Sequence, residues 1–328
     1  LKMRMRRAIA SAWVFLAMTA DTGVFAQSWK PDKNIEINIG LSAGSSQDRT
    51  GRALQKVWQE NKVLTVPVNV VNRASGGGAL ALTALAQHPG DGHFLYVSSP
   101  TFLTSYITGL SKYQHSDFTP LALLGKQYLA IATRPESAVK SGRDLMERLK
   151  RDPYGYSIGI NGAGGTLHIV SGLLIRAVGG DPKKARITVF TGAELMTAGI
   201  GGHVEAIVTV ASNILPHVES GKLNMLAVTS PRRLTGALAT VPTFQEQGVD
   251  LVLQNWAALF GAKGLNAQQR AYWDSLISAT VAMPAWKTFV ESNQWEPEYL
   301  NSAEFRRYLA AEDKRLRSAL ADLGLAKQ

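Results

Sequence analysis

The 328-residue sequence contains no cysteine. This absence excludes disulfide bonds, thiolate metal sites, cysteine nucleophiles and a lipid-modified cysteine at an export cleavage site. The six histidines of the chain show no metal-ligand spacing, and no nucleophile–base–acid set can be assembled from the sequence. We therefore expect no metal site, no cofactor and no catalysis.

Long apolar runs are also lacking. A membrane-spanning helix needs about 20 apolar residues, and the one candidate, the run 8–20, is too short. Four basic residues precede that run, and the tripeptide Val-Phe-Ala at 24–26 follows it with the residue types of a cleavage site. This order predicts a signal peptide over residues 1–26, with an uncleaved membrane anchor as the alternative. We expect a soluble periplasmic protein without a lipid anchor.

Charge is unbalanced towards the basic side, with a formal net charge of +10. A positive charge suits an acidic ligand or partner. Nucleic acid is not expected as a partner, because export separates the protein from it and the sequence has no dense basic and aromatic patch.

Strand-like and helix-like segments alternate along the chain. A chain of this size is too large for one typical core, so two domains are expected. The first series has strands at 35–40, 66–71 and 94–97 and helices at 48–61 and 79–87. The second has strands at 128–133, 156–160, 186–190, 204–210 and 223–229 and helices at 141–150, 166–178 and 193–200. The last stretch is mainly helical, at 266–281, 284–292 and 302–323. This pattern predicts an α/β fold of parallel sheets flanked by helices.

Two apolar stretches, 121–131 and 256–261, lack partners inside this alternation. Each could be an ordinary core strand. Paired, they would be two crossover strands through which the chain leaves the first lobe and returns to it. On that reading, lobe 1 comprises residues 27–126 and 256–328, and lobe 2 comprises residues 127–255. Trp256 would either wall a pocket between the lobes or belong to the core.

Two glycine-rich turns stand where a strand should pass into a helix. The first consists of Leu41, Ser42, Ala43, Gly44, Ser45 and Ser46, and the second of Asn161, Gly162, Ala163, Gly164, Gly165 and Thr166. Glycine lets a ligand approach the backbone, and the N-terminus of the following helix favours an anion. Either turn could instead be a plain strand-to-helix corner, as could the glycines at 76–78. The second turn matches neither a P-loop nor a dinucleotide fingerprint. Together the turns predict two half-sites for one small acid.

Three polar residues beside these turns allow two readings each. Asp48 lies at the predicted start of a helix, where capping the helix is its expected role and ligand contact the alternative. Thr166 either caps its helix or offers its hydroxyl to the anion. His168, in the first helical turn, faces either the cleft or the interior of the lobe, where it would be a hydrogen-bonded structural histidine.

From about Trp29 to Leu325 the sequence resembles the periplasmic solute-binding proteins of the tripartite tricarboxylate transporter type, often called Bug proteins. The resemblance depends on the order and spacing of several motifs. They are 29–33 (Trp-Lys-Pro-Asp-Lys), Ala43-Gly44 with Asp48 and Arg52, Asn72-Arg73 before the glycines 76–78, Asp91-Gly92, Asp117-Phe118 with Pro120, Gly162 and Gly164 with Thr166 and His168, Gly201-Gly202, 227–230 with Arg233, and 241–243 with Glu246 and Gly248.

The resemblance implies a two-lobed periplasmic-binding-protein fold, of the Venus flytrap type and type II-like, without catalysis. It implies that a ligand carboxylate sits between the two glycine loops, partly through ordered water. The implied partners are a small organic acid and the membrane subunits of a tripartite transporter, and a monomer is expected. A sensor that feeds a membrane kinase and an enzyme on the same scaffold are the alternatives.

The sequence departs from the family pattern at three places. Ser45 stands where the family's first loop usually has a second glycine. A tyrosine-lysine-glycine sequence of the family aligns with Val189, Phe190 and Thr191, and an often acidic position aligns with Thr209. Loss of the acid removes a partner for a ligand ammonium group, and Phe190 adds aromatic surface. Our hypothesis is therefore a ligand with a carboxylate and an apolar or aromatic body, rather than an acidic amino acid.

Overall fold

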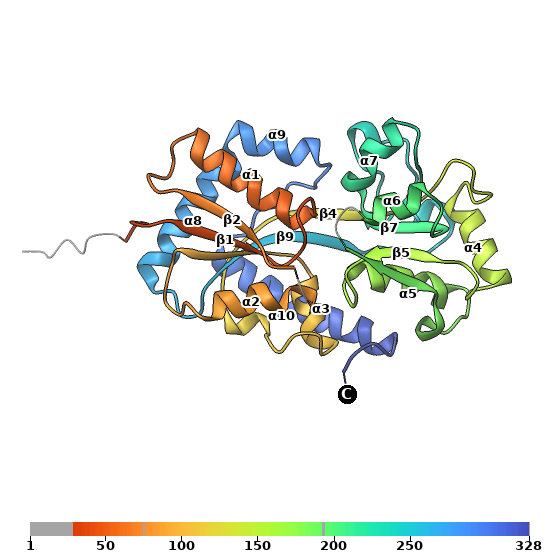
Figure 1. Cartoon of the computed structure of the whole chain (residues 1–328), viewed down its shortest axis with the longest axis horizontal. Coiled ribbons are helices and arrows are strands. Elements are labelled where there is room, and N and C mark those ends of the chain that lie inside the picture. Colours follow the sequence, from red (N-terminus) through yellow and green to blue (C-terminus); the bar gives the residue numbers. More distant parts are fainter. Residues whose placement is uncertain (1–28, 75, 192–193, 328) are drawn as a thin grey trace, which may run out of the picture.

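The computed structural model describes residues 29–74, 76–191 and 194–327. The predicted signal peptide, residues 1–26, lies outside the described residues. Two groups of helices and strands lie side by side and are joined by two strands that run between them (Figure 1). Among the described residues, no helix combines the length and apolar character that crossing a membrane requires.

The first group of elements has the predicted alternation of strands and helices. Its elements are β1 (Ile35–Ile39), α1 (Ser46–Glu60), β2 (Val68–Asn72), α2 (Ala79–Ala86), β3 (Phe94–Ser98) and α3 (Thr101–Ile107). β1 is central and pairs in parallel with both β2 and β3. The predicted bounds of these strands and of the two predicted helices are correct to within two residues, whereas α3 was not predicted.

The second group repeats this plan. Its elements are α4 (Gly142–Arg151), β5 (Ile158–Asn161), α5 (Thr166–Ala177), β6 (Ile187–Phe190), α6 (Glu194–Ile200), β7 (Ala206–Val210), α7 (Ala211–Glu219) and β8 (Asn224–Val228). β5 pairs in parallel with β6 and β7. The predicted strands and helices are confirmed, but α7 was not predicted.

Two crossover strands connect the groups, which is the second of the two readings of the apolar stretches. β4 (Thr119–Thr133) pairs antiparallel with β9 (Gln254–Gly261), from Thr119 opposite Gly261 to Tyr128 opposite Gln254. β9 then adjoins β3 in the first group, and the second half of β4 adjoins β7 and β8 in the other. The α/β two-lobed fold class is thus confirmed, with parallel strands in each lobe and antiparallel crossover strands between them.

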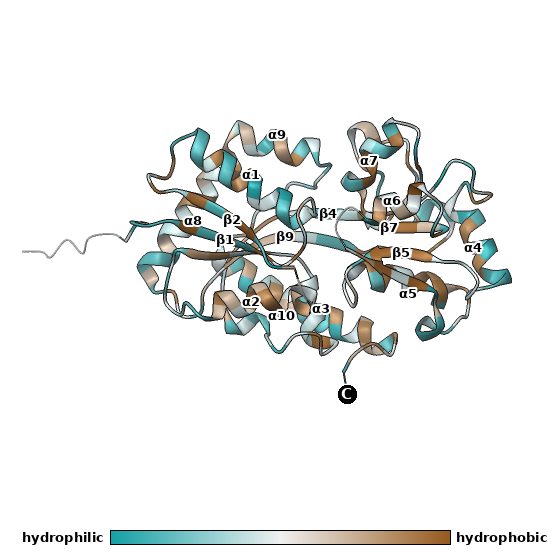
Figure 2. Ribbon diagram, viewed as in Figure 1, coloured by the Kyte–Doolittle hydropathy of each residue, from teal (hydrophilic) through white to brown (hydrophobic). Residues whose placement is uncertain are grey.

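The core lies between the strands and the helices that cover them. Ile35, Ile37 and Ile39 of β1 are fully buried, and Figure 2 shows β5 and β7 as mainly hydrophobic and α1 as mainly hydrophilic. Trp256 of β9 is also fully buried, and its Nε1 donates to Glu312 at 3.4 Å. Of its two readings, the core one is correct.

The three C-terminal helices lie close to the predicted ranges: α8 (Ala267–Ala282), α9 (Pro284–Ser292) and α10 (Ser302–Asp322). Asn266 and Asn301 cap α8 and α10 in capping boxes, and proline occupies the first position of α9, where its missing N–H costs nothing. Beyond α10, Leu323 lies against Gly172 of α5. The C-terminal segment therefore reaches from the first group of elements to the second.

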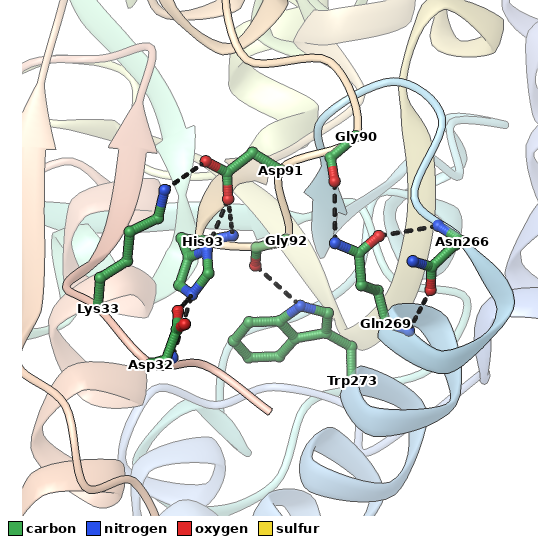
Figure 3. Close-up of polar contacts among 9 residues, drawn as sticks. All are labelled: Asp32, Lys33, Gly90, Asp91, Gly92, His93, Asn266, Gln269 and Trp273. Carbon is green, nitrogen blue, oxygen red and sulfur yellow. Dashed lines mark hydrogen bonds and ion pairs between the residues drawn. The ribbon is translucent and has the colours of Figure 1, made fainter. Parts of the chain in front are cut away.

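The segment before β1 is fastened to the turn that leads into β3 (Figure 3). His93 is almost fully buried, with Nδ1 2.6 Å from a carboxylate oxygen of Asp91 and Nε2 3.2 Å from the backbone nitrogen of Asp32. Burial alone would raise the pKa of Asp91, but hydrogen bonds from Lys33 and His93 outweigh it and lower the pKa to about 2. The Asp91–Gly92 turn therefore has a structural role.

Gly125, in the middle of β4, packs closely against a tryptophan, and this contact can be tested by substitution. The pairing with β9 shifts register between Leu123 and Gly125, and a Cβ at Gly125 would lie 2.7 Å from Cε3 of Trp295. Gly125→Ala should lower the free energy of unfolding by roughly 1–3 kcal/mol, because a buried ring must move. Urea denaturation measures this loss.

Trp295→Leu provides the matched background for that substitution. Adding Gly125→Ala to Trp295→Leu should cost less than adding it to the wild type, because the clashing ring is gone. Equal costs in both backgrounds would contradict the proposed contact.

Candidate ligand-binding site

A cavity of about 500 Å³ lies between the two lobes. Both glycine turns line it, the first at the carboxyl end of β1 and the second at the carboxyl end of β5. Of the predicted site residues, fourteen line the cavity: Leu41, Ser42, Ala43, Gly44, Ser45, Ser46, Asn161, Gly162, Ala163, Gly165, Thr166, Phe190, Thr191 and Thr209. Asp48, Gly164 and His168 do not.

The first glycine loop ends in a capped helix. Ser45 precedes α1, and its Oγ accepts a hydrogen bond from the backbone N–H of Asp48 at 3.3 Å. Gly44 has φ of +80°, and a Cβ placed on it would have no atom within 4 Å. Because few L-residues adopt such a φ, glycine suits this position, and its open side leaves the backbone accessible.

Asp48 supports this loop from behind rather than capping the helix. Its carboxylate accepts the backbone N–H of Gly44 at 2.9 Å and pairs with Nε of Arg52 at 3.0 Å. Burial raises the pKa of Asp48, but the bonds from Arg52 and Gly44 outweigh burial and lower it. Asp48 therefore remains ionised, and the helix cap that we expected of it is supplied by Ser45.

The second loop is supported in the same way, by a side chain four residues after one of its glycines. Nδ1 of His168 accepts the backbone N–H of Gly164 at 3.1 Å, as Asp48 accepts that of Gly44. Burial lowers the pKa of His168, which favours the neutral ring that this acceptor role requires. The reading of His168 as a hydrogen-bonded structural histidine agrees with this geometry.

Two glycines of the second loop face in different directions. Gly162 has φ of +76° and no atom within 4 Å of a placed Cβ, so it faces open space in the cavity. Gly164 has φ of +72°, but its Cβ would meet Thr108 and Leu110, which follow α3 of the first lobe. Gly162 is therefore placed for a ligand, whereas Gly164 allows the lobes to approach closely.

Thr166 does not cap α5, but its side chain is hydrogen-bonded to a crossover strand. Gly165 is the N-cap of α5 and makes no side-chain capping bond. Oγ1 of Thr166 lies 3.4 Å from Oδ1 of Asn255 on β9, and Nδ2 of Asn255 donates to Oε1 of Gln127 on β4 at 3.2 Å. Thr166 thus ties the start of α5 to both crossover strands.

The described lining of the cavity includes a cation and no acidic side chain. Among the described residues that line it, Arg49 is a permanent cation and none is an aspartate or glutamate. The described residues also contain no cluster of three or more histidine, cysteine or acidic side chains suited to a metal ion. An open cavity with two helix N-termini, a guanidinium and no carboxylate is suited to an anion.

A family model described as "Tripartite tricarboxylate transporter family receptor" matches residues 52–325. The chain belongs to this family. One relative of the receptor is a "UPF0065 protein in gbd 5'region" of Cupriavidus necator, 26% identical over 323 residues, which cover 98% of this chain and 97% of that protein.

Solved structures agree with the fold. "R. palustris Rpa4515 with adipate" has a TM-score of 0.83 at 20% identity and covers 90% of this chain and 99% of its own. "MatC (Rpa3494) from Rhodopseudomonas palustris with bound malate" has a TM-score of 0.76 at 19% identity and covers 89% and 100%. At these identities the likeness shows the two-lobed fold of the receptor.

β6 and the residue after it supply a largely apolar part of the lining of the receptor's cavity, at positions where the sequence departs from the family pattern, and we call this part the far wall. Val189 and Phe190 end β6 and line the cavity together with Leu110, Leu167 and Met196. The hydroxyl of Thr191 is bonded to Glu194 at 2.8 Å, and that of Thr209 accepts from Asn213 at 3.2 Å. The wall therefore offers apolar surface edged by hydroxyls that are already bonded.

Sequence reasoning missed six polar residues that line the cavity: Arg49, Ser99, Thr101, Asn213, His217 and Asn255. Asn213 and His217 belong to α7, and Thr101 to α3, the two helices that were not predicted. A usable signal existed for Asn213. It follows the predicted strand 204–210, and the carboxyl ends of parallel strands meet at one edge of a sheet.

His168 makes the stability of the receptor depend on pH. Its folded pKa is lowered from 6.5, so the unfolded chain binds a proton at pH values where the folded chain does not. The stabilisation is fully present above pH 6.5 and is lost as the pH falls below it. His168→Gln keeps an acceptor for Gly164 but does not titrate, so it should lose less unfolding free energy than the wild type between about pH 7 and pH 5.

Urea denaturation at the two pH values measures this difference. His203→Gln removes an exposed histidine and is the matched control, which should behave like the wild type. If His168→Gln is as acid-sensitive as the wild type, the buried neutral ring is not the cause.

Proposed function

We propose that this receptor captures a small organic carboxylate in the periplasm and presents it to the membrane subunits of a tripartite transporter. The observation that carries the proposal is the pair of glycine loops from opposite lobes that line one cavity without an acidic residue among its described lining. The two structural neighbours contain adipate and malate, which is consistent with this class of ligand.

In this mechanism the carboxylate lies between the two loops. Backbone N–H groups at the starts of α1 and α5 donate to it, since the first N–H groups of a helix lack partners within the helix. Contacts from both lobes stabilise the closed arrangement, and the carboxylate shifts the open–closed equilibrium by its differential affinity for the closed state. Ordered water would complete the contacts.

The rest of the ligand meets the apolar far wall. Phe190, Val189 and Met196 line that side, and the family's often acidic position is occupied by Thr209, whose hydroxyl is already bonded to Asn213. A ligand ammonium group would therefore find no carboxylate partner there. We propose a carboxylate with an apolar or aromatic body, rather than glutamate or aspartate.

The remaining expectations belong to the same proposal. The receptor is exported by the signal peptide 1–26, acts as a monomer and does not catalyse a reaction. Its lobes are residues 27–126 with 256–328, and residues 127–255. The crossover of β4 and β9 near Lys126 and Trp256 supports these boundaries.

Leucine substitutions at the open glycines test the site. Gly44→Leu and Gly162→Leu should each raise the Kd of a carboxylate at least about tenfold, equivalent to about 1.4 kcal/mol, because the side chain enters the cavity. Isothermal titration calorimetry measures the Kd. Gly179→Leu is the matched control, since Gly179 has φ of +82° and an equally open Cβ but does not line the cavity.

The control variant should bind like the wild type. Unchanged affinity in both cavity variants, with folding verified by circular dichroism, would refute the assignment of the two loops to the site.

A thermal-shift panel tests the nature of the ligand. Aliphatic and aromatic carboxylates of four to eight carbons should raise the Tm more than glutamate or aspartate at the same concentration, because a ligand stabilises the state that binds it. A larger shift with glutamate or aspartate than with every apolar carboxylate would overturn the proposed ligand class.

A further inference from the structure

The side chain of Arg49 comes from the first lobe and contacts the second. It lies in α1, one turn after the first glycine loop, and its Nη2 donates to Oγ of Ser212 at 3.1 Å and to Oδ1 of Asn213 at 2.5 Å. Both acceptors lie in the first turn of α7, in the second lobe. Nδ2 of Asn213 in turn donates to Oγ1 of Thr209 at 3.2 Å. A continuous hydrogen-bonded chain therefore joins α1 to β7.

The guanidinium is incompletely satisfied in this arrangement. Its Nε is buried and has no hydrogen-bond partner among the residues that the structure describes. The acceptors of Nη2 are neutral, and Arg49 makes no ion pair with any described residue. A partly buried cation without a counter-ion is unfavourable compared with one that is paired, so an anion beside the guanidinium would stabilise this arrangement.

A negative charge that pairs with Arg49 can come from the cavity. Arg49 lines the cavity, and no described lining residue is acidic. The far wall at Val189, Phe190 and Thr191 contributes no cation either. An anion in the cavity would thus meet a guanidinium that comes from the first lobe and is held by the second.

We propose that Arg49 is a positioning residue that latches the two lobes and is completed by the anionic group of the ligand. The inference rests on the proposed function, because the anion is the captured carboxylate. With the lobes apart, the guanidinium is hydrated and separated from Ser212 and Asn213. With the lobes together and the cavity occupied, the carboxylate supplies the counter-charge that makes the bridge favourable.

The latch has two consequences. The receptor distinguishes an anion from a neutral ligand of the same shape, because a neutral group leaves the partly buried guanidinium without a counter-charge. Binding is also coupled to lobe closure through a side chain that contacts both lobes, so closure requires the charge and the cross-lobe acceptors together.

Calorimetry with matched ligands tests the first consequence. The probes are the carboxylate of the four-to-eight-carbon series that raises the wild-type Tm most, and its primary amide. Arg49→Met should raise the Kd of the carboxylate at least about tenfold and lower the preference for carboxylate over amide by a similar factor, as expected for loss of a charge-assisted contact. Arg49→Lys, which keeps the charge, should recover part of that preference.

Lys56→Met is the matched control. It removes a cation from the same helix, where Lys56 is exposed and lies 4.0 Å from Glu60, and it should leave both Kd values within about twofold of the wild type. If it weakens carboxylate binding as much as Arg49→Met does, the effect is one of net charge and the latch is refuted.

Small-angle X-ray scattering tests the coupling to closure. The wild type at saturating carboxylate should have a smaller radius of gyration than the unliganded receptor. Arg49→Met and Asn213→Ala, each saturated with the same carboxylate, should show little of this compaction, although Asn213→Ala retains the cation. Full compaction in both variants would overturn the latch.

The outcomes separate this inference from the proposed function. If no carboxylate binds the wild type, the proposed function fails and the latch fails with it. If the wild type binds a carboxylate but Arg49→Met keeps the affinity, the preference and the compaction, the latch alone fails.

Discussion

The antiparallel pairing of β4 with β9 is the constraint on which the rest of the structure depends. The pairing runs from Thr119 opposite Gly261 to Tyr128 opposite Gln254, and each strand then adjoins the sheet of a different lobe. The hydrogen bonds between β4 and β9 therefore hold the two lobes next to each other. The carboxyl ends of β1 and β5 consequently open onto one cavity.

Within that frame the site is built twice from the same parts. Each glycine loop leads into a helix, and in each a side chain four residues later accepts the backbone N–H of a glycine, Asp48 from Gly44 and His168 from Gly164. These side chains hold the loops from behind and leave the cavity side to backbone, hydroxyl and apolar groups. The cavity thus presents positive potential from two helix N-termini and from Arg49.

Much of this arrangement could be predicted from sequence, because it depends on local rules. Alternation of apolar residues located the strands, and glycines at strand ends located both loops. The connectors were visible because 121–131 and 256–261 are apolar and match no predicted helix. The contacts of the individual glycines could not be predicted. A Cβ on Gly162 would point into open space, whereas a Cβ on Gly164 would meet Thr108 and Leu110 of the other lobe, and the sequence of the loop does not distinguish the two.

The elements that sequence reasoning missed were those with weak local signals. α3 is only seven residues long and has no side-chain cap, and α7 contains Pro216 and begins directly after β7 without a capping side chain. The polar wall that α7 supplies was missed with it. Arg49 was missed for a different reason, because it lies in a predicted helix and its partners are 163 and 164 residues away in the sequence.

In the proposed mechanism, loops from opposite lobes hold one carboxylate. A crystal structure of the receptor with a bound carboxylate tests it most directly. We expect carboxylate oxygens within about 3 Å of backbone nitrogens, or of waters held by them, in both the 41–46 loop and the 161–166 loop. A carboxylate bound by a single loop, or outside the cavity between the lobes, would contradict it.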